Sequence, residues 1–298
     1  MSTEHLNMIK GYSSSLKYCR RLAETHYENF IVTSFLLSKR LRQPFHVVYA
    51  YCRHSDDLAD EIGGSDENRK ESLRLLDQWE RELDQCFDET EPPAHPIYVA
   101  LREIAREFGL PKKPFADLLV AFRRDQTQRR YETLEELLDY CRFSADPVGR
   151  IVLQLAYGAT GKTGPSEQEI EWSDSICTGL QLANHWQDVA RDAEIGRCYI
   201  PGAIAEQFGV DLEHLSETDD FRRMMQFLVD DARSRLRFGG PLIEAVPKLV
   251  RREITLFQCG GLAVLDAIER VNFNVLRRRP IVSRWKKFRL LLGTLFSF

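Results

Sequence analysis

The stretch Asn-His-Trp-Gln-Asp-Val-Ala-Arg-Asp, residues 184–192, decides how the rest of the chain is understood. Residues four apart share one face of a helix, so Asn184, Asp188 and Asp192 form a polar stripe roughly 12 Å long. Two carboxylates at this spacing repel each other, so a positive charge is expected between them. Carboxylate and amide oxygens are ligands of hard cations. The alternative is a solvated helix face, the usual setting of an isolated acidic pair.

A second acidic pair makes the solvated-face interpretation weaker. Residues 53–61 read Arg-His-Ser-Asp-Asp-Leu-Ala-Asp-Glu, so Asp56 and Asp60 are also four apart, and they continue the apolar, aromatic stretch 45–52. Unpaired carboxylates on a largely apolar helix are costly to bury. Two such helices facing each other across a cavity would hold Mg²⁺, which combines a few carboxylates with waters and phosphate oxygens of a substrate. We therefore predict a metal-diphosphate site. Its predicted metal ligands are Asp56, Asp60, Asn184, Asp188 and Asp192.

Together the two segments resemble the paired aspartate motifs of the squalene/phytoene synthase family. Residues 196–201, Gly-Arg-Cys-Tyr-Ile-Pro, are also similar to the family pattern, and the resemblance runs from about Tyr18 to about Arg279. It implies an all-α, single-domain isoprenoid synthase fold over residues 1–279, with a central apolar cavity and the four aspartates at its mouth. Residues 280–298 are expected to form a separate basic amphipathic tail. It also implies a Mg²⁺-dependent enzyme that joins or rearranges isoprenoid diphosphates.

Two departures from the family pattern indicate a particular branch. Residues 26–30, His-Tyr-Glu-Asn-Phe, lie where the family usually carries His-Ser-x-Ser-Phe, so Tyr27 and Asn29 replace two hydroxyls near the diphosphate, and Phe30 is kept. Gln187 stands where condensing members often carry arginine. Both features resemble the bacterial hydroxysqualene synthases of hopanoid biosynthesis. For residues 26–30, the alternative is a helix connection with packed aromatic side chains.

Other predicted substrate-binding residues surround the two motifs. Arg53 is predicted either to bind diphosphate with its planar guanidinium or to form an ion pair with Asp56 or Asp57. Arg129 and Arg130 either face phosphate or belong to a solvated basic face. The remaining residues predicted to bind substrate are Gln181, Asn184, Arg197 and Tyr199; Arg197 would close over diphosphate, and Tyr199 either lines the cavity or is packed.

A third departure bears on the chemistry. Residues 140–149 resemble the family pattern Tyr-Cys-x-x-Val-Ala-Gly-x-Val-Gly, but Ser144 replaces the first valine and Asp146-Pro147 replaces the glycine and its neighbour. Proline inside a helix frees a carbonyl and kinks the chain. We predict that Tyr140 and Ser144 join the four aspartates as catalytic residues, with Ser144 and the freed carbonyl positioning water beside a carbocation. The alternative is a kink without a chemical role.

Helices are expected over the remaining chain. The predicted ranges are 13–24, 44–60, 66–87, 97–108, a helix within 115–131, one that begins at Thr133 and carries residues 140–150, about 166–192, 221–238 and 249–275. Ser, Thr and Pro at several starts, and Gly at several ends, are typical helix boundaries. Phe257, Leu262 and Phe273 are expected either in the core or along a prenyl tunnel.

Composition excludes several classes of protein. The chain has 298 residues, 43% hydrophobic, and a net charge of −4, which gives nucleic acid no general attraction. Its seven cysteines form no Cys-x-x-Cys, so we expect neither a disulfide framework nor a zinc site, and a reducing cytoplasm fits. No signal peptide or spanning helix is expected, because no apolar run of about 18 residues occurs.

The end of the chain is basic and amphipathic. Its basic residues are Arg277, Arg278, Arg279, Arg284, Lys286, Lys287 and Arg289, interspersed with Trp285 and several Leu and Phe. Such a segment suits an anionic membrane surface, so we expect peripheral contact with the inner face of the membrane. The alternative is a tail packed on the domain. Neighbouring enzymes of the hopanoid pathway are the expected protein partners.

Three hypotheses of function follow. The first is a hydroxysqualene synthase that ionises presqualene diphosphate with Mg²⁺, rearranges the cation and captures it with water, without NADPH. The second is a synthase that condenses two prenyl diphosphates head to head into presqualene diphosphate, squalene or phytoene. The third is a helical binding protein, which would predict eroded aspartates, whereas all four are intact.

Overall fold

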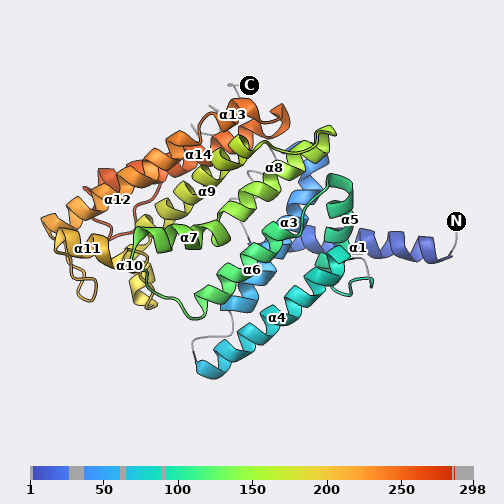
Figure 1. Ribbon diagram of the computed structural model, residues 1–298, viewed down its shortest axis with the longest axis horizontal. Helices are drawn as coiled ribbons and strands as arrows, with labels where there is room; N and C mark the ends of the chain where they lie inside the picture. The colour runs from blue at the N-terminus through green and yellow to red at the C-terminus, as the bar shows by residue number, and fades with distance from the viewer. Residues whose placement is uncertain (1–2, 27–36, 61–64, 89–90, 284, 286–298) are drawn as a thin grey trace. The chain divides into compact units, whose positions relative to one another are not determined.

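The computed structural model describes residues 3–26, 37–60, 65–88, 91–283 and 285, without the side chains of residues 3–10 and 60. All regular elements in these residues are helices, which confirms the predicted all-α class (Figure 1). The helices are α1 (Thr3–His26), α3 (Lys39–Asp60), α4 (Asp66–Asp88), α5 (Pro96–Phe108), α6 (Lys113–Asp125), α7 (Leu134–Ser144), α8 (Asp146–Thr160), α9 (Glu167–Gln187), α10 (Val189–Glu194), α11 (Gly202–Phe208), α12 (Asp219–Phe238), α13 (Leu242–Ala245) and α14 (Lys248–Arg270).

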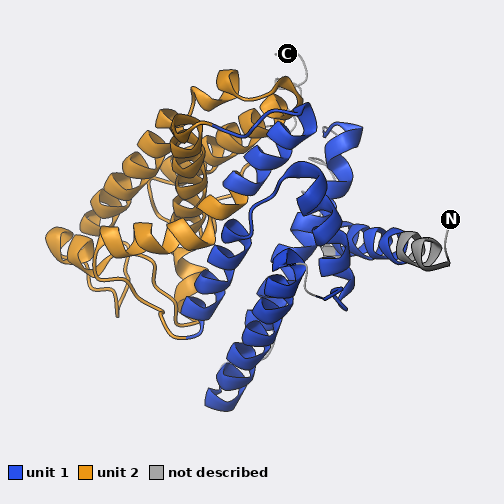
Figure 2. Cartoon of the chain, turned by 45° about the vertical axis from the view of Figure 1, so that its right-hand side comes forward, with its two compact units in different colours: residues 1–126, 150–165 blue, residues 127–149, 166–298 orange. Residues whose placement is uncertain are grey.

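The chain forms two compact units (Figure 2). Unit 1 comprises residues 1–126 and 150–165, and unit 2 comprises residues 127–149 and 166–298. The first aspartate motif therefore belongs to unit 1 and the second to unit 2. No described helix is long and apolar enough to cross a membrane.

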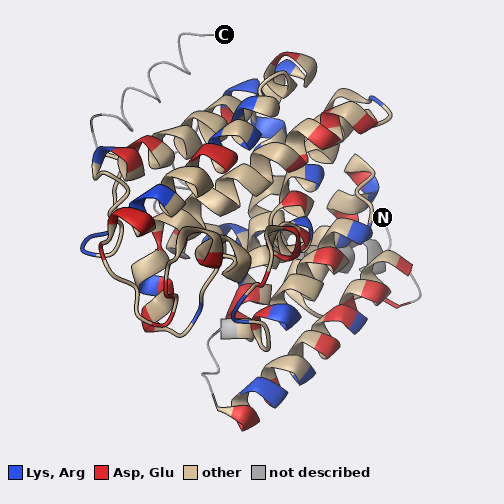
Figure 3. Cartoon of the chain, turned by 60° about the vertical axis from the view of Figure 1, so that its left-hand side comes forward, with Lys and Arg blue, Asp and Glu red and all other residues tan. Residues whose placement is uncertain are grey.

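Unit 1 is built around an aromatic core that holds the end of α3. The indole Nε1 of Trp79 donates to Ser55 Oγ at 2.9 Å, and Tyr98 Oη donates to the Trp79 carbonyl at 2.6 Å. Tyr51 Oη donates to the Phe115 carbonyl at 2.9 Å. The polar atoms of these three aromatic side chains thus have partners, as buried polar groups require. Helix α4 packs its apolar face against this core, and its other faces carry charges of both signs (Figure 3).

The predicted start of α3 was wrong. Pro44 was expected in the first turn, but the helix begins at Lys39 and Pro44 lies inside it. Proline removes one backbone donor there, and the long apolar face of the helix compensates for this loss because it is buried. Other boundaries were closer: α4, α5 and α12 begin within two residues of prediction.

The predicted kink at Pro147 is a break between two helices. Helix α7 ends at Ser144, Ala145 adopts φ −121° and ψ −51°, and α8 starts at Asp146. Pro147 therefore lies in the first turn of α8, where its missing N–H has no helical partner to lose. The prediction that Pro147 lies in the interior of a helix was wrong.

In unit 2, helices α9, α12 and α14 pack closely through glycines. A Cβ atom at Gly261 would lie 2.8 Å from Leu180 Cδ2 and 3.0 Å from Leu236 Cδ1. Gly179 meets the same Leu236, so small residues on two helices make room for one buried leucine on α12. Ser166 begins α9 with a reciprocal capping box, in which its hydroxyl and the Glu169 carboxylate bind each other's backbone N–H.

Two neighbouring glycines of α14 give a matched test of this packing. Gly261→Ala should lower the free energy of unfolding by about 1–3 kcal/mol, because the added methyl overpacks against Leu180 and Leu236. Gly260→Ala has open space around its Cβ and should raise stability by up to about 1 kcal/mol through helix propensity. Urea denaturation followed by circular dichroism measures both. Equal effects of the two substitutions would contradict the close approach of these helices.

Candidate functional site

The second aspartate motif crosses a small irregularity in the helix. Asp188 itself is not helical, with φ −105° and ψ 12°, so the predicted continuous helix to Asp192 was wrong at this one residue. The Asp188 N–H still donates to the Asn184 carbonyl at 3.0 Å, and the Asp192 N–H donates to the Asp188 carbonyl at 2.8 Å. The three residues therefore remain one helical turn apart, as the sequence pattern predicts.

The two carboxylates of this motif differ in their surroundings. The Asp192 side chain is partly buried; burial, followed by the neighbouring Asp188 charge, raises the pKa of its carboxyl to about 6. Arg197 opposes this shift from the loop that follows. Asp188 is 17% exposed and is neutralised by Arg279. Asn184 is exposed, so the motif offers oxygen atoms that a ligand from solvent can reach.

Arg279 returns from the end of unit 2 to bind the motif. Its Nε contacts Asp188 Oδ1, and its Nη2 lies 3.0 Å from Asp188 Oδ2 and 2.9 Å from Gln187 Oε1. Gln187 is buried and donates its Nε2 to the carbonyl of Pro280. The side-chain amide of Gln187 thus binds the C-terminal segment with both ends. The positive charge expected beside the aspartates is, in this structure, a guanidinium.

A cluster of aromatic rings lies beside the motif. His185 stacks on Tyr199, with ring centroids 3.6 Å apart and an interplanar angle of 18°. Tyr131 stacks on the same Tyr199 at 5.8 Å, and Tyr140 lies 6.1 Å from it. Burial lowers the pKa of His185 to about 3, so its imidazole stays neutral at physiological pH. Its Nε2 lies 3.3 Å from Gln181 Nε2.

The aromatic cluster depends on how the exit loop after the motif is held. The Cys198 N–H donates to the Arg129 carbonyl at 2.8 Å, and Gly202 and Ala203 donate to the Tyr131 and Glu132 carbonyls at 3.0 and 2.9 Å. These bonds fix the segment 198–203 against residues 129–132. Tyr199 is thereby placed against Tyr131.

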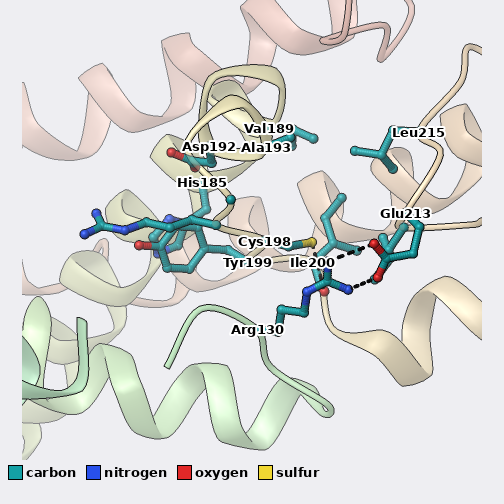
Figure 4. A pocket seen from close by; sticks show the side chains of 13 residues that line it. Arg130, His185, Val189, Asp192, Ala193, Cys198, Tyr199, Ile200, Glu213 and Leu215 are labelled. Atoms are coloured by element: carbon teal, nitrogen blue, oxygen red, sulfur yellow. Dashed lines mark hydrogen bonds and ion pairs between the residues drawn. The ribbon is translucent and has the colours of Figure 1, made fainter. Parts of the chain in front are cut away.

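A cavity of about 160 Å³ opens beside this cluster. Its lining includes Asp192, Arg197, Tyr199, His185 and Arg130 (Figure 4). Arg130 reaches Glu213 with both Nη atoms, one of them at 3.1 Å, and the two side chains are 58% and 62% exposed, so this ion pair lies at the solvated surface. Arg129 donates to the Ile195 carbonyl at 3.1 Å. The structure thus brings together Asp192, Arg197 and Tyr199, three residues that the sequence predicted separately.

The first motif lies at the end of α3 in unit 1. Arg53 pairs with Asp56 at 3.3 Å and also contacts Asp57, which is the ion-pair alternative for this residue. The Asp60 backbone ends α3, but its side chain lies outside the described residues, as do Tyr27, Asn29 and Phe30. Their predicted roles stay predictions.

Two polar groups lie at the junction of α7 and α8 in unit 2. Asp146 is 3% exposed, and its carboxylate accepts a hydrogen bond from Thr178 Oγ1 at 2.8 Å. The Ser144 hydroxyl is buried and has no hydrogen-bond partner among the described residues. Such a group often marks the position of an ordered water. Tyr140, one turn earlier, belongs to the aromatic cluster.

The residues of the second motif fit a magnesium ion that is shared with a phosphate group. Within the described part of the chain, no three His, Cys, Asp or Glu side chains form a ready-made metal cluster. Asp188 and Asp192 supply two carboxylates one turn apart, and Asn184 supplies an amide oxygen. Mg²⁺ commonly takes only one or two carboxylates and fills its octahedron with waters and phosphate oxygens. This donor set suits that arrangement.

Sequence reasoning missed three residues of this region. His185 stands within the quoted motif, but its stacking on Tyr199 depends on the exit loop. Glu213 carries no local pattern that links it to Arg130. Arg279 was predicted only as one of several basic residues near the C-terminus, because its partner Asp188 lies 91 positions earlier in the sequence.

Comparisons with known proteins agree with this architecture. The family model of squalene/phytoene synthase matches residues 23–286. A hydroxysqualene synthase of Sinorhizobium fredii is 35% identical over 74% of this chain and 71% of its own, and a phytoene synthase of Arthrospira platensis is 30% identical over 94% and 92%.

The crystal structure of the squalene synthase HpnC from Alicyclobacillus acidocaldarius superimposes with a TM-score of 0.81 at 39% identity, covering 88% of this chain and 96% of that one. This similarity confirms the predicted isoprenoid synthase fold. The chain belongs to the squalene/phytoene synthase family.

Proposed function

We propose that this protein is a hydroxysqualene synthase: it ionises presqualene diphosphate with Mg²⁺, rearranges the cation and captures it with water, releasing hydroxysqualene and diphosphate. The broader statement, an enzyme that processes prenyl diphosphates, follows from family membership. The observation that carries the proposal is the intact pair Asp188 and Asp192 beside a buried aromatic cluster, preceded by Gln187.

Similarity to known proteins supports the finer assignment. Hydroxysqualene synthases of three bacteria are 35–37% identical over 61–74% of the chain. Phytoene synthases match more of the chain, 90–94%, at 25–30% identity. The second candidate, a condensing synthase, is favoured by that longer coverage. Gln187 favours the first, because the condensing members that the motif resembles often carry arginine there.

Each group of residues has a proposed task. Asn184, Asp188 and Asp192 in unit 2, and Asp56 and Asp60 in unit 1, would hold Mg²⁺. The metal, when bound, would neutralise the diphosphate and stabilise it as a leaving group. Arg53, Arg197 and Gln181 are proposed to orient the substrate, together with Tyr27, Asn29 and Phe30. Gln187 was predicted to bind substrate as well, but its amide is used by Arg279 and Pro280 in the structure.

The aromatic cluster is proposed to protect the cation. Tyr140, Tyr199 and neutral His185 present ring faces, and ring faces attract positive charge. Because the imidazole of His185 is neutral and carries no positive charge, it does not repel a cationic intermediate. The Ser144 hydroxyl, buried and without a partner among the described residues, is proposed to hold the water that captures the cation.

Location and partners are also proposals. The exposed side chains of Ile281 and Trp285, next to Arg277 and Arg278, support contact of the C-terminal tail with the inner face of a membrane. The lipid nature of the proposed substrate and product supports a cytoplasmic enzyme that is peripheral to that membrane, beside other hopanoid-pathway enzymes. The separation of residues 280–298 from a domain of residues 1–279 stays a prediction.

Product analysis tests the proposed reaction. Purified protein with Mg²⁺ and presqualene diphosphate, without NADPH, should yield hydroxysqualene by mass spectrometry, and EDTA should abolish it. Farnesyl diphosphate alone should yield no presqualene diphosphate. Formation of presqualene or prephytoene diphosphate from shorter substrates would instead establish the condensing alternative.

Removing one motif charge tests the metal ligands. Asp192→Asn should lower kcat by about 100-fold or more, because loss of metal-assisted leaving-group stabilisation costs several kcal/mol. Glu171→Gln, which neutralises an exposed carboxylate in the second turn of α9, far from the motif in sequence, is the control and should retain activity. Steady-state kinetics at saturating Mg²⁺ compares the two. Similar losses in both variants would point to a general effect on α9.

Removing one hydroxyl tests water capture. Ser144→Ala should shift products from hydroxysqualene toward dehydrated hydrocarbons while substrate consumption changes less than tenfold, since the water is needed only after ionisation. Ser175→Ala, whose hydroxyl donates to the Arg235 carbonyl, should leave the product ratio unchanged. Gas chromatography of the products measures that ratio. An unaltered ratio in Ser144→Ala would assign the water to another residue.

A further inference from the structure

The C-terminal segment of unit 2 binds the second aspartate motif through a residue that the proposed chemistry does not use. Val275 and Pro280 are buried, and Arg277 forms an ion pair with Glu217. Between them Arg279 contacts both oxygens of Asp188. Residues 275–283, the C-terminal strap, are therefore attached to a carboxylate that is itself a proposed metal ligand.

We propose that Arg279 is an internal counter-ion that competes with the divalent cation for Asp188, so that metal binding releases the C-terminal strap from the second aspartate motif. The inference rests on the proposed function, which supplies the metal. It adds a residue and a conformational consequence that the reaction itself does not require.

The geometry of the contact makes the two cations compete. Arg279 binds Asp188 side-on, with Nε at one oxygen and Nη2 at the other. A metal ion at the same carboxylate would lie close to the guanidinium, and like charges at contact distance repel strongly where water is partly excluded. Asp188 is only 17% exposed, so solvent screens this repulsion incompletely.

The same contact is weak enough to exchange. Half of the Arg279 side chain is exposed, and ion pairs near the surface contribute little net stability. A dication shared by Asp188, Asp192 and phosphate oxygens offers these carboxylates a larger positive charge. Arg279 thus neutralises the motif when no metal is bound without blocking the metal's entry.

Loss of Arg279 from Asp188 would loosen the strap. Arg279 Nη2 also donates to Gln187 Oε1 at 2.9 Å, so its departure removes contacts to two adjacent residues. The bond from Gln187 to the Pro280 carbonyl and the Arg277–Glu217 ion pair would remain. By thermodynamic reciprocity, whatever detaches the strap should also strengthen metal binding.

Metal affinity without prenyl substrate tests the competition. Mn²⁺ titrations followed by electron paramagnetic resonance should show that Arg279→Gln binds Mn²⁺ at least about fivefold more tightly than wild type. Arg278→Gln removes the same charge from an exposed position one residue earlier and should change the affinity less than twofold. Arg279→Lys keeps the charge but lacks the two-pronged geometry and should fall between wild type and Arg279→Gln.

Limited proteolysis tests release of the strap. Mg²⁺ should accelerate tryptic cleavage after Arg278 in wild type, as followed by mass spectrometry, whereas Arg279→Gln should be cleaved rapidly with or without Mg²⁺. Circular dichroism establishes that the variants are folded, and the unchanged rate of Arg279→Gln controls for effects of the metal on trypsin.

Three outcomes would overturn the proposal. Equal Mn²⁺ affinities of Arg279→Gln and Arg278→Gln would refute the role of Arg279 as a counter-ion while leaving the metal site intact. A wild-type cleavage rate that does not change at saturating Mg²⁺ would do the same. Absence of Mn²⁺ binding in wild type and Arg279→Gln alike would refute it together with the metal ligands of the proposed function.

Discussion

The partial burial of two neighbouring carboxylates, Asp188 and Asp192, is the constraint on which the charges around the second motif depend. The two carboxylates lie one helical turn apart, and burial together with the repulsion between them raises the pKa of Asp192 to about 6. The chain compensates with cations from outside the motif: Arg197 from the following loop and Arg279 from beyond α14. To deliver Arg279, the C-terminal segment must return to the end of α9. That return accompanies the close packing of α14 on α9, where Gly261 and Gly179 leave room for Leu236.

The aromatic cluster beside the second aspartate motif complements its charges. In the proposed reaction, a leaving diphosphate needs positive charge, whereas the carbocation it leaves behind needs a surface that carries no positive charge of its own. In the proposed reaction, neutral His185 and the rings of Tyr199 and Tyr140 would provide such a surface. Backbone bonds between residues 129–132 and 198–203 hold Tyr199 there, so the exit loop is part of the site rather than a connection.

Local patterns predicted what depends on local physics. The one-turn spacing of the second aspartate pair, the start of a helix near Ser166 and the apolar periodicity of α4, α5 and α12 all follow from local helix geometry, and the structure agrees with them apart from the irregularity at Asp188. The two prolines were misplaced in opposite directions: Pro44 was predicted at a helix start and lies inside α3, whereas Pro147 was predicted inside a helix and lies in the first turn of α8. Proline is compatible with a helix start, but its presence alone does not reveal whether the helix extends before it. Arg279 was missed because its partner lies 91 positions away, and a basic run alone does not reveal which of its members pairs with a carboxylate.

Gln187 and Arg279 are best understood as a matched pair. Gln187 is buried, accepts from Arg279 and donates to Pro280, so both ends of its amide are used. An arginine at this position would bring a second guanidinium against the first, and burying two like charges side by side is costly. It would also lose the acceptor that Arg279 Nη2 uses. The positive charge that condensing relatives often carry inside the motif is therefore, in this chain, supplied from the C-terminal segment. A charge on the motif helix is fixed in place, whereas one on a returning segment can leave when another cation arrives.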